Sequence, residues 1–279
     1  IQEAINAVDV GDTIIVRAGT YTENVNVNKD HLTIRSESGA EATIVQGVNP
    51  DDHVFEVTTA YVNISGFTVK GATVSAAGIH LSYDADRCNI SDSDISNNLY
   101  GIYIYSRLHG DVYGRASVFN STFSNNTYGI YSLSDFTYRY GEVYVFNSTF
   151  SNNTYGIHSS SYCNVLVQNS TLSDNTYGIF GQTKLSIHAK YSTFSDNTYG
   201  IYGSNVWGTS TIFSDFSNNT YANRWDEGVS FYSELSTYSN NTYGIYTYHL
   251  WDDGDLVGVT VRFTTCLLYT SPSPRDRTR

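Results

Sequence analysis

The sequence predicts an all-β solenoid, a parallel β-helix in which short strands wind around one long core. The first observation is a repeat, because FNSTFSNNTYGIY at 119–131 returns as FNSTFSNNTYGIH at 146–158. The second is the regular return of weaker copies along the chain. The third is composition, since the repeats are rich in Val, Ile, Phe, Tyr and Thr and show no helical periodicity. A short fixed period of strand-forming residues is typical of a solenoid.

The glycine of each YGI marks the period. The markers are Gly101, Gly129, Gly156, Gly178, Gly200 and Gly244, with Ala222 in the remaining place. The steps are 28 and 27 residues, followed by four steps of 22. A coil of 22 residues suits two or three short strands, and stacking places them parallel and about 4.8 Å apart. We therefore expect about eleven coils, with insertions within 106–116 and 133–142.

Positions within the repeat indicate structural roles. Phe123 and Ile130 are expected in the core, Asn126 at a corner and Gly129 at a turn. The recurring Asn pairs suit corners, because Asn tolerates left-handed conformations and bonds its own backbone. Stacked from coil to coil, their side chains would form an Asn ladder.

The first coils complete the fold prediction. Ile1, Ile5 and Val8 have the spacing of one helix face, which would cap the open end of the core. The segments GDTIIV, AGTYTENV and LTIRS follow. With the repeats, this opening resembles right-handed parallel β-helix proteins of the NosD-like and carbohydrate-binding/sugar-hydrolase group. The resemblance implies right-handed coils and a secreted or cell-surface protein. It leaves activity open, because this scaffold hosts lyases, hydrolases, esterases, adhesins and spacers.

The chain of 279 residues is acidic, with a formal net charge of −12. This charge argues against nucleic-acid binding, which needs clustered Lys and Arg. No stretch approaches the roughly 18 consecutive apolar residues of a membrane span. The absence of Met and the opening IQEAINAV indicate an N-terminally truncated fragment of a larger protein.

The C-terminal segment shares nothing with the repeats. CLLYTSPSPRD at 266–276 resembles the translation of a transposase-type sequencing adapter at every position. We therefore predict a β-helix domain over 1–265 and a non-native tail over 266–279.

Metal and thiol chemistry finds little support. Cys88 and Cys163 would lie about 14 Å apart along the rod, beyond the reach of a disulfide, so we expect free thiols. The seven His residues show no paired spacing and Met is absent, which argues against copper. No cofactor is expected, although the Asp-x-Asp runs at Asp84–Asp86 and Asp92–Asp94 have oxygen ligands of the kind that Ca²⁺ prefers.

A column of largely aromatic residues follows the buried Ile of each marker and must point outward from its strand. It contains Tyr103, Tyr131, His158, Phe180, Tyr202 and Tyr246, with Arg224 between the last two. The column is either a stacking ladder that stabilises the rod or a platform for sugar rings. In the second case Arg107 and Arg139, from the insertions, would join it. The partner would then be a polysaccharide or a cell-surface glycan.

Catalysis is the alternative function. A lyase or glycoside hydrolase acting on an acidic polysaccharide needs carboxylates close together. The alternatives are Asp84 and Asp86 in one acidic run, or Asp226 and Glu227 beside Arg224. Neither pair has a partner that spacing identifies, so we favour a non-catalytic structural, adhesive or polysaccharide-binding role. A pure spacer within a larger surface protein is the third possibility.

Overall fold

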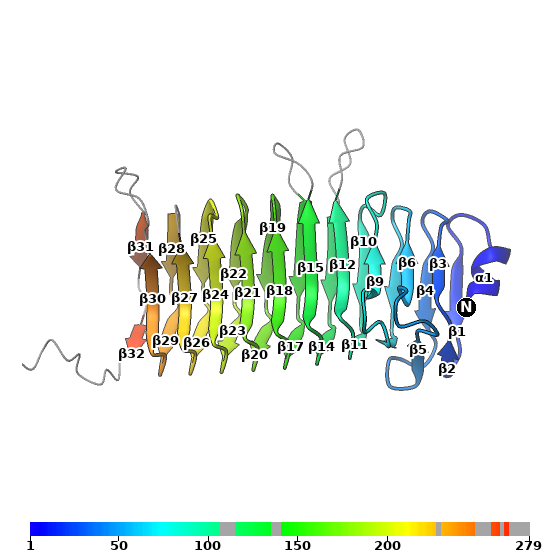
Figure 1. The fold of residues 1–279 in the computed structure, drawn as a ribbon, viewed down its shortest axis with the longest axis horizontal. Helices are drawn as coiled ribbons and strands as arrows, with labels where there is room; N and C mark the ends of the chain where they lie inside the picture. Colours follow the sequence, from blue (N-terminus) through cyan, green and yellow to red (C-terminus); the bar gives the residue numbers. More distant parts are fainter. Residues whose placement is uncertain (107–114, 135–140, 227–229, 249–257, 263–264, 268–279) are drawn as a thin grey trace, which may run out of the picture.

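The computed structural model is a rod of stacked coils bounded by three parallel sheets, here called A, B and C (Figure 1). It describes residues 1–106, 115–134, 141–226, 230–248, 258–262 and 265–267. Each coil contributes one short strand to each sheet, and strands pair only with those of neighbouring coils. The parallel β-helix and its number of coils are confirmed, since sheets A and B each contain 11 strands and sheet C contains 10.

The strands alternate regularly between the sheets. Sheet A contains β1 (Thr13–Val16), β4 (Thr33–Ser36), β7 (Asn63–Ser65), β10 (Cys88–Ser91), β13 (Arg115–Phe119), β16 (Gly141–Phe146), β19 (Cys163–Gln168), β22 (Ser186–Lys190), β25 (Gly208–Ile212), β28 (Ser230–Glu234) and β31 (Val259–Arg262). Sheet B contains β2 (Gly19–Thr22), β5 (Thr43–Gln46), β8 (Thr68–Lys70), β11 (Asp94–Ser96), β14 (Thr122–Ser124), β17 (Thr149–Ser151), β20 (Thr171–Ser173), β23 (Thr193–Ser195), β26 (Asp215–Ser217), β29 (Thr237–Ser239) and β32 (Thr265–Leu267). Sheet C contains β3 (Val25–Val27), β6 (Phe55–Val57), β9 (Ala77–Leu81), β12 (Tyr100–Ser106), β15 (Tyr128–Ser134), β18 (Tyr155–Ser160), β21 (Tyr177–Gln182), β24 (Tyr199–Ser204), β27 (Tyr221–Asp226) and β30 (Tyr243–Tyr248).

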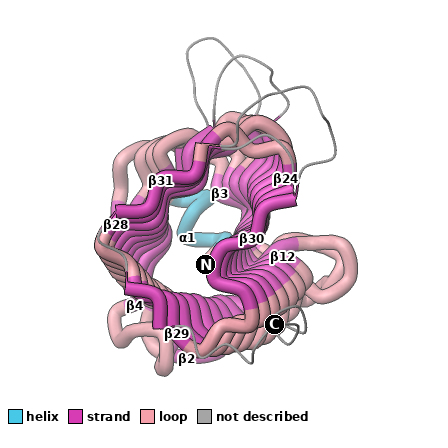
Figure 2. The backbone as a smooth tube through the Cα atoms, turned by 90° about the vertical axis from the view of Figure 1, so that its left-hand side faces the viewer, coloured by secondary structure: helices cyan, strands magenta, loops and turns pink. Residues whose placement is uncertain are grey.

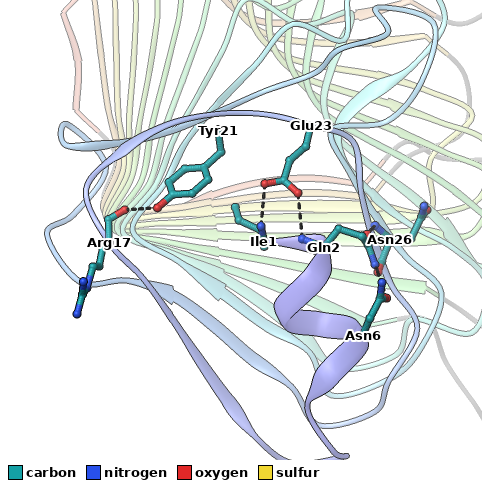
Figure 3. A network of polar contacts seen from close by, with 7 residues as sticks. All are labelled: Ile1, Gln2, Asn6, Arg17, Tyr21, Glu23 and Asn26. Atoms are coloured by element: carbon teal, nitrogen blue, oxygen red, sulfur yellow. Dashed lines mark hydrogen bonds and ion pairs between the residues drawn. The ribbon is translucent and has the colours of Figure 1, made fainter.

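Helix α1 (Gln2–Ala7) lies across the first coil, as the sequence predicts (Figure 2). Its residue Ile5 is fully buried, and Ile1 and Val8 pack against the same core. Glu23 holds the start of the helix, because its two carboxylate oxygens accept from the backbone nitrogens of Ile1 at 2.8 Å and Gln2 at 2.9 Å (Figure 3). The helix therefore covers apolar side chains that the first coil would otherwise leave in contact with water.

Identical positions of successive coils stack inside the rod. Phe123 and Phe150 stack with their ring centroids 4.6 Å apart, and Phe194 and Phe216 do so at 4.7 Å. Ile130 belongs to a second buried column, from strand to strand of sheet C. The core positions read from the repeat are confirmed. Cys88 and Cys163 are buried in the same core as free thiols, again as predicted.

Two ladders of polar side chains fill the corners. The corner between sheets B and C holds the predicted Asn ladder, whose members are Asn98, Asn126, Asn153, Asn175, Asn197, Asn219 and Asn241. The corner between sheets A and B holds a Ser ladder that sequence reasoning missed. In this ladder each backbone nitrogen donates to the next Ser Oγ at 3.1–3.3 Å, as from Ser148 to Ser170. Buried backbone groups at both corners are thereby satisfied.

The marker glycines were wrongly placed at turns. Gly129 lies inside strand β15 and is buried, and Gly156 occupies the same place in β18. A Cβ on Gly129 would lie 2.4 Å from the carbonyl oxygen of Gly156. Glycine avoids this clash at Gly129, although the same column holds the small residue Ala222 at a later coil.

A departure from the buried Ile column is matched by a second departure nearby. Asn223 replaces the buried Ile, and Tyr238 replaces Phe in the adjacent stack. Asn223 Nδ2 donates to the Tyr238 hydroxyl at 2.9 Å, and that hydroxyl lies 3.1 Å from Thr211 Oγ1. The two changes together give Asn223 Nδ2 and the Tyr238 hydroxyl buried partners, whereas Asn223 Oδ1 has none among the described residues.

Both long steps of the repeat occur at the corner between sheets C and A. The insertion within 106–116 links β12 to β13, and that within 133–142 links β15 to β16. Their flanks are neighbours, since Ser106 pairs with Ser134 and Arg115 pairs with Glu142. The residues 107–114 and 135–140, which include Arg107 and Arg139, lie outside the described part of the chain. At the other end β32 crosses the predicted boundary at 265/266, which stays a prediction.

Candidate functional site

The predicted aromatic column lies on the outer face of sheet C. Pairing aligns the following residues coil by coil: Asn26, Glu56, His80, Tyr103, Tyr131, His158, Phe180, Tyr202, Arg224 and Tyr246. The six aromatic residues predicted as binding residues are all half-buried. The structure therefore brings the predicted column together and extends it towards the N-terminus.

A second aromatic column runs beside it, and sequence reasoning missed it. It consists of the residue that precedes each marker: Tyr100, Tyr128, Tyr155, Tyr177, Tyr199, Tyr221 and Tyr243. Successive rings lie 4.6–5.1 Å apart and within 19° of parallel. The signal was available, since a Tyr stands directly before every marker. We call the two columns together the aromatic platform.

The rings of the two columns are oriented differently. Each ring inside the second column is covered on both faces by its neighbours, so it presents an edge and a hydroxyl to solvent. The predicted column is less regular, because Tyr131 lies at 59° to Tyr103 and at 88° to His158, whereas Phe180 and Tyr202 stack within 8°. Tyr246 lies at 73° to Tyr221. The second column is therefore the main stacking ladder that stabilises the rod. The first column contains tilted rings, whose faces point in different directions.

Arg224 interrupts the first column and is held by its surroundings. Its guanidinium binds Asp226 in a two-point contact, Nε to Oδ1 at 3.2 Å and Nη2 to Oδ2 at 3.3 Å. The Tyr202 hydroxyl donates to the same carboxylate. Four ring centroids surround the guanidinium carbon at 5.3–5.7 Å, those of Tyr199, Tyr202, Tyr221 and Tyr246. Burial and this hydrogen bond raise the pKa of Tyr202, so its phenol stays protonated.

The structure separates the residues of the first acidic run. Asp84 is exposed at the corner between sheets C and A, whereas Asp86 is buried and accepts from the Arg115 backbone nitrogen at 2.9 Å. Strand β10 separates this corner from Asp92 and Asp94. Within the described residues, no three His, Cys, Asp or Glu side chains are grouped to hold a metal ion. Of the second proposed pair, Asp226 and Glu227, only Asp226 is among the described residues.

A hollow on the outer face of sheet A is lined by titratable side chains that the sequence analysis did not bring together. Its volume is 330 Å³, and its lining includes Glu142, Tyr144, Asn164, Leu166, His188 and Lys190. Tyr144, Leu166 and His188 occupy the same position of three successive coils. The Glu142 carboxylate forms an ion pair with Arg115, with Oε2 2.9 Å from Nε, and accepts from the Tyr144 hydroxyl at 2.8 Å. Burial, and then Lys190, lowers the pKa of His188.

The comparison with protein families decides the classification. Residues 77–249 match the model of the right-handed β-helix region family. The chain belongs to this family. The right-handed β-helix expected from the resemblance is thus confirmed, while no curated protein matches the chain in sequence.

Solved structures similar to this β-helix include several proteins named for polysaccharides. The A-module of mannuronan C-5 epimerase AlgE4 from Azotobacter vinelandii is 14% identical with a TM-score of 0.67, over 97% of this chain and 93% of that chain. Pectate lyase Pel9A is 16% identical with a TM-score of 0.58, over 90% and 74%. ORF18 of Geobacillus virus E2 is 16% identical with a TM-score of 0.63, over 89% of this chain and only 57% of the viral protein. At these identities the similarity concerns the fold.

No helix in the described part of the β-helix is long and apolar enough to cross a membrane.

His158 gives the platform of this β-helix a dependence on pH. Burial lowers its pKa from 6.5 to about 4. Neither ring nitrogen has a hydrogen-bond partner among the described residues. Between pH 6.5 and 4, His158 is therefore protonated in the unfolded chain but neutral in the folded protein. The free energy of unfolding consequently falls as the pH falls.

His158→Phe should make the free energy of unfolding less sensitive to pH over this range, by about 2–3 kcal/mol. Phe180 shows that the column accepts Phe at the next coil. Urea denaturation at pH 4 and pH 7 measures the change. Some dependence will remain, because burial also lowers the pKa of His80 to about 4. An identical pH dependence in the variant and the parent protein would contradict the assignment.

Proposed function

We propose that this β-helix binds polysaccharide along the aromatic platform and has no catalytic role there. The observation that carries the proposal is the double column of mostly half-buried aromatic rings along sheet C, which Arg224 interrupts at one coil. Tyrosine suits sugar binding, because it joins an apolar ring to a hydroxyl that exchanges hydrogen bonds. We place this activity outside the cell or on its surface, where long glycans are found. The similar folds of proteins named for mannuronan and pectate support polysaccharide as the ligand class and leave the charge of the polysaccharide open.

The spacing of the coils supports a long ligand rather than a single sugar. Neighbouring tyrosine rings in the second column lie 4.6–5.1 Å apart, and their hydroxyls repeat at the same interval. An extended hexose chain advances by a similar distance per sugar. A chain lying along the rod therefore meets equivalent groups at every coil, and many weak contacts add up. In this proposal the tilted rings of Tyr131 and Tyr246 stack against sugar faces, and Arg107 and Arg139 contact the glycan from the insertions.

The hollow on sheet A supports a second candidate, cleavage of a polysaccharide. A carboxylate, a phenol and an imidazole of lowered pKa line one cavity there, and such groups perform acid–base chemistry. This candidate stands beside the sequence-based alternatives at Asp84, Asp86 and Asp226. Asp84 is exposed, Asp86 accepts from the Arg115 backbone nitrogen, and Asp226 binds Arg224 and Tyr202. Release of new reducing or unsaturated ends from a panel of polysaccharides would favour it over simple binding.

Removing the two most tilted rings should weaken binding strongly. We expect the double variant Tyr131→Ala, Tyr246→Ala to lose roughly five- to 150-fold in affinity, since each aromatic contact contributes about 0.5–1.5 kcal/mol. Affinity electrophoresis in native gels containing neutral or acidic polysaccharides measures the loss.

Tyr191→Ala is the matched control, because this tyrosine is 54% exposed and lies at the corner between sheets A and B. It should keep full retardation. Thermal unfolding of both variants separates lost contacts from lost structure. Equal retardation of the double variant and the control by every polysaccharide would reject the platform as the binding surface.

A further inference from the structure

The charged side chains of the platform indicate which polysaccharide it selects. Along the described outer face of sheet C these side chains are Glu56, Arg224 and Asp226. The two histidines of the column, His80 and His158, are neutral near pH 7 because burial lowers their pKa values to about 4. Among the described residues this face therefore carries one cation, Arg224, and two carboxylates. Asp226 lies beside Arg224, whereas Glu56 lies in β6, at the other end of the sheet from β27.

Arg224 is poorly placed to receive an anionic ligand. Its Nε and Nη2 are already bound to Asp226, and its Nη1 lies 3.4 Å from the Tyr199 hydroxyl. Four tyrosine rings surround the guanidinium. A paired guanidinium of this kind fixes the positions of the rings around it, whereas a carboxylate arriving from solution would first have to displace Asp226.

We propose that the platform selects uncharged polysaccharide and excludes polyuronates, an inference that rests on the proposed function. The long-range field points the same way, because the chain carries a net charge of −12 and repels a polyanion. Specificity of this kind comes from a repulsive element, here the net negative charge, as much as from attraction. Neutral sugars are not repelled by this field. Their C–H faces can pack on the aromatic rings, and their hydroxyls can exchange hydrogen bonds with the phenols of the platform.

A matched pair of polymers tests the proposal. Polygalacturonate and its fully methyl-esterified form share one backbone and differ in the carboxylate charge. At low salt the ester should bind at least tenfold more tightly than the acid form, and added salt should narrow the difference as the repulsion is screened. Equal or tighter binding of the acid form would overturn the inference and leave the proposed function standing. Binding of neither form, nor of any neutral glucan, galactan or mannan in the same gels, would overturn the proposed function itself.

A gain of binding supplies the second arm. Asp226→Asn removes the carboxylate that occupies Arg224, so affinity for polygalacturonate should rise at least fivefold. Asp215→Asn is the control, because it makes the same change of net charge at an exposed position of sheet B. If both variants raise the affinity equally, the paired Arg224 is not the determinant and only net charge matters. Thermal unfolding confirms that both variants are folded.

Discussion

Asn175→Ala should destabilise the β-helix more than any other change of a single corner residue in its coil. We expect a loss of about 4 kcal/mol, because each buried polar group left without a partner costs about 1–3 kcal/mol. Asn175 Oδ1 accepts from the backbone nitrogen of Asn153 at 3.0 Å. Its Nδ2 donates to the carbonyl oxygens of Phe150 at 3.0 Å and Ser173 at 2.9 Å. Alanine removes all of these contacts, and because Asn175 is only 3% exposed the groups left without partners are buried.

Thr176→Ala is the control for this variant. Thr176 is the next residue of the same corner, but its side chain is exposed. Its replacement should change stability by no more than about 0.5 kcal/mol. Urea denaturation followed by far-UV circular dichroism compares the two variants with the parent protein. Similar midpoints for both variants would show that the ladder contributes little to stability.

The sequence was sufficient for the fold because its regularities follow from local physics. The 22-residue period, the strand-forming residues and the Asn pairs each constrain one coil, and repetition adds the constraints together. The Ser ladder escaped notice because Ser121, Ser148 and Ser170 follow residues with positive φ, and Ser is common in any turn. The marker Gly129 was misplaced for a related reason. Its role depends on the close approach of another coil, which one-dimensional spacing does not show.

The candidate site was predictable only in part. The column from Tyr103 to Tyr246 was found because a strand alternates its side chains. The stacked column from Tyr100 to Tyr243 is equally regular in the sequence. Its role as a stacking ladder depends on the orientation of the rings, which the sequence does not show. The hollow on sheet A was beyond reach, because Glu142 and His188 are 46 residues apart in sequence and meet only through the register of β16, β19 and β22.

Gly178→Ala should be destabilising although alanine is the smallest possible addition. A Cβ at this position would lie 2.4 Å from the carbonyl oxygen of Gly200 and 3.2 Å from the ring of Phe194. Neither neighbour can retreat, because the oxygen belongs to the backbone of the next coil and the ring is stacked on Phe216 at 4.7 Å. We expect a loss of about 3 kcal/mol in the free energy of unfolding.

Gly208→Ala separates this clash from the general properties of glycine. Gly208 also lies in a strand, β25, but its nearest neighbour to an added Cβ is the Ser230 carbonyl oxygen at 3.6 Å, an ordinary contact. Alanine there should be neutral or should stabilise the protein by up to about 1 kcal/mol, since it restricts the unfolded chain. Urea midpoints of the two variants should therefore move in different directions or by very different amounts. If both urea midpoints fell equally, the strand glycines would matter through their flexibility. The close contact between neighbouring coils would then not be what keeps the aromatic platform in register.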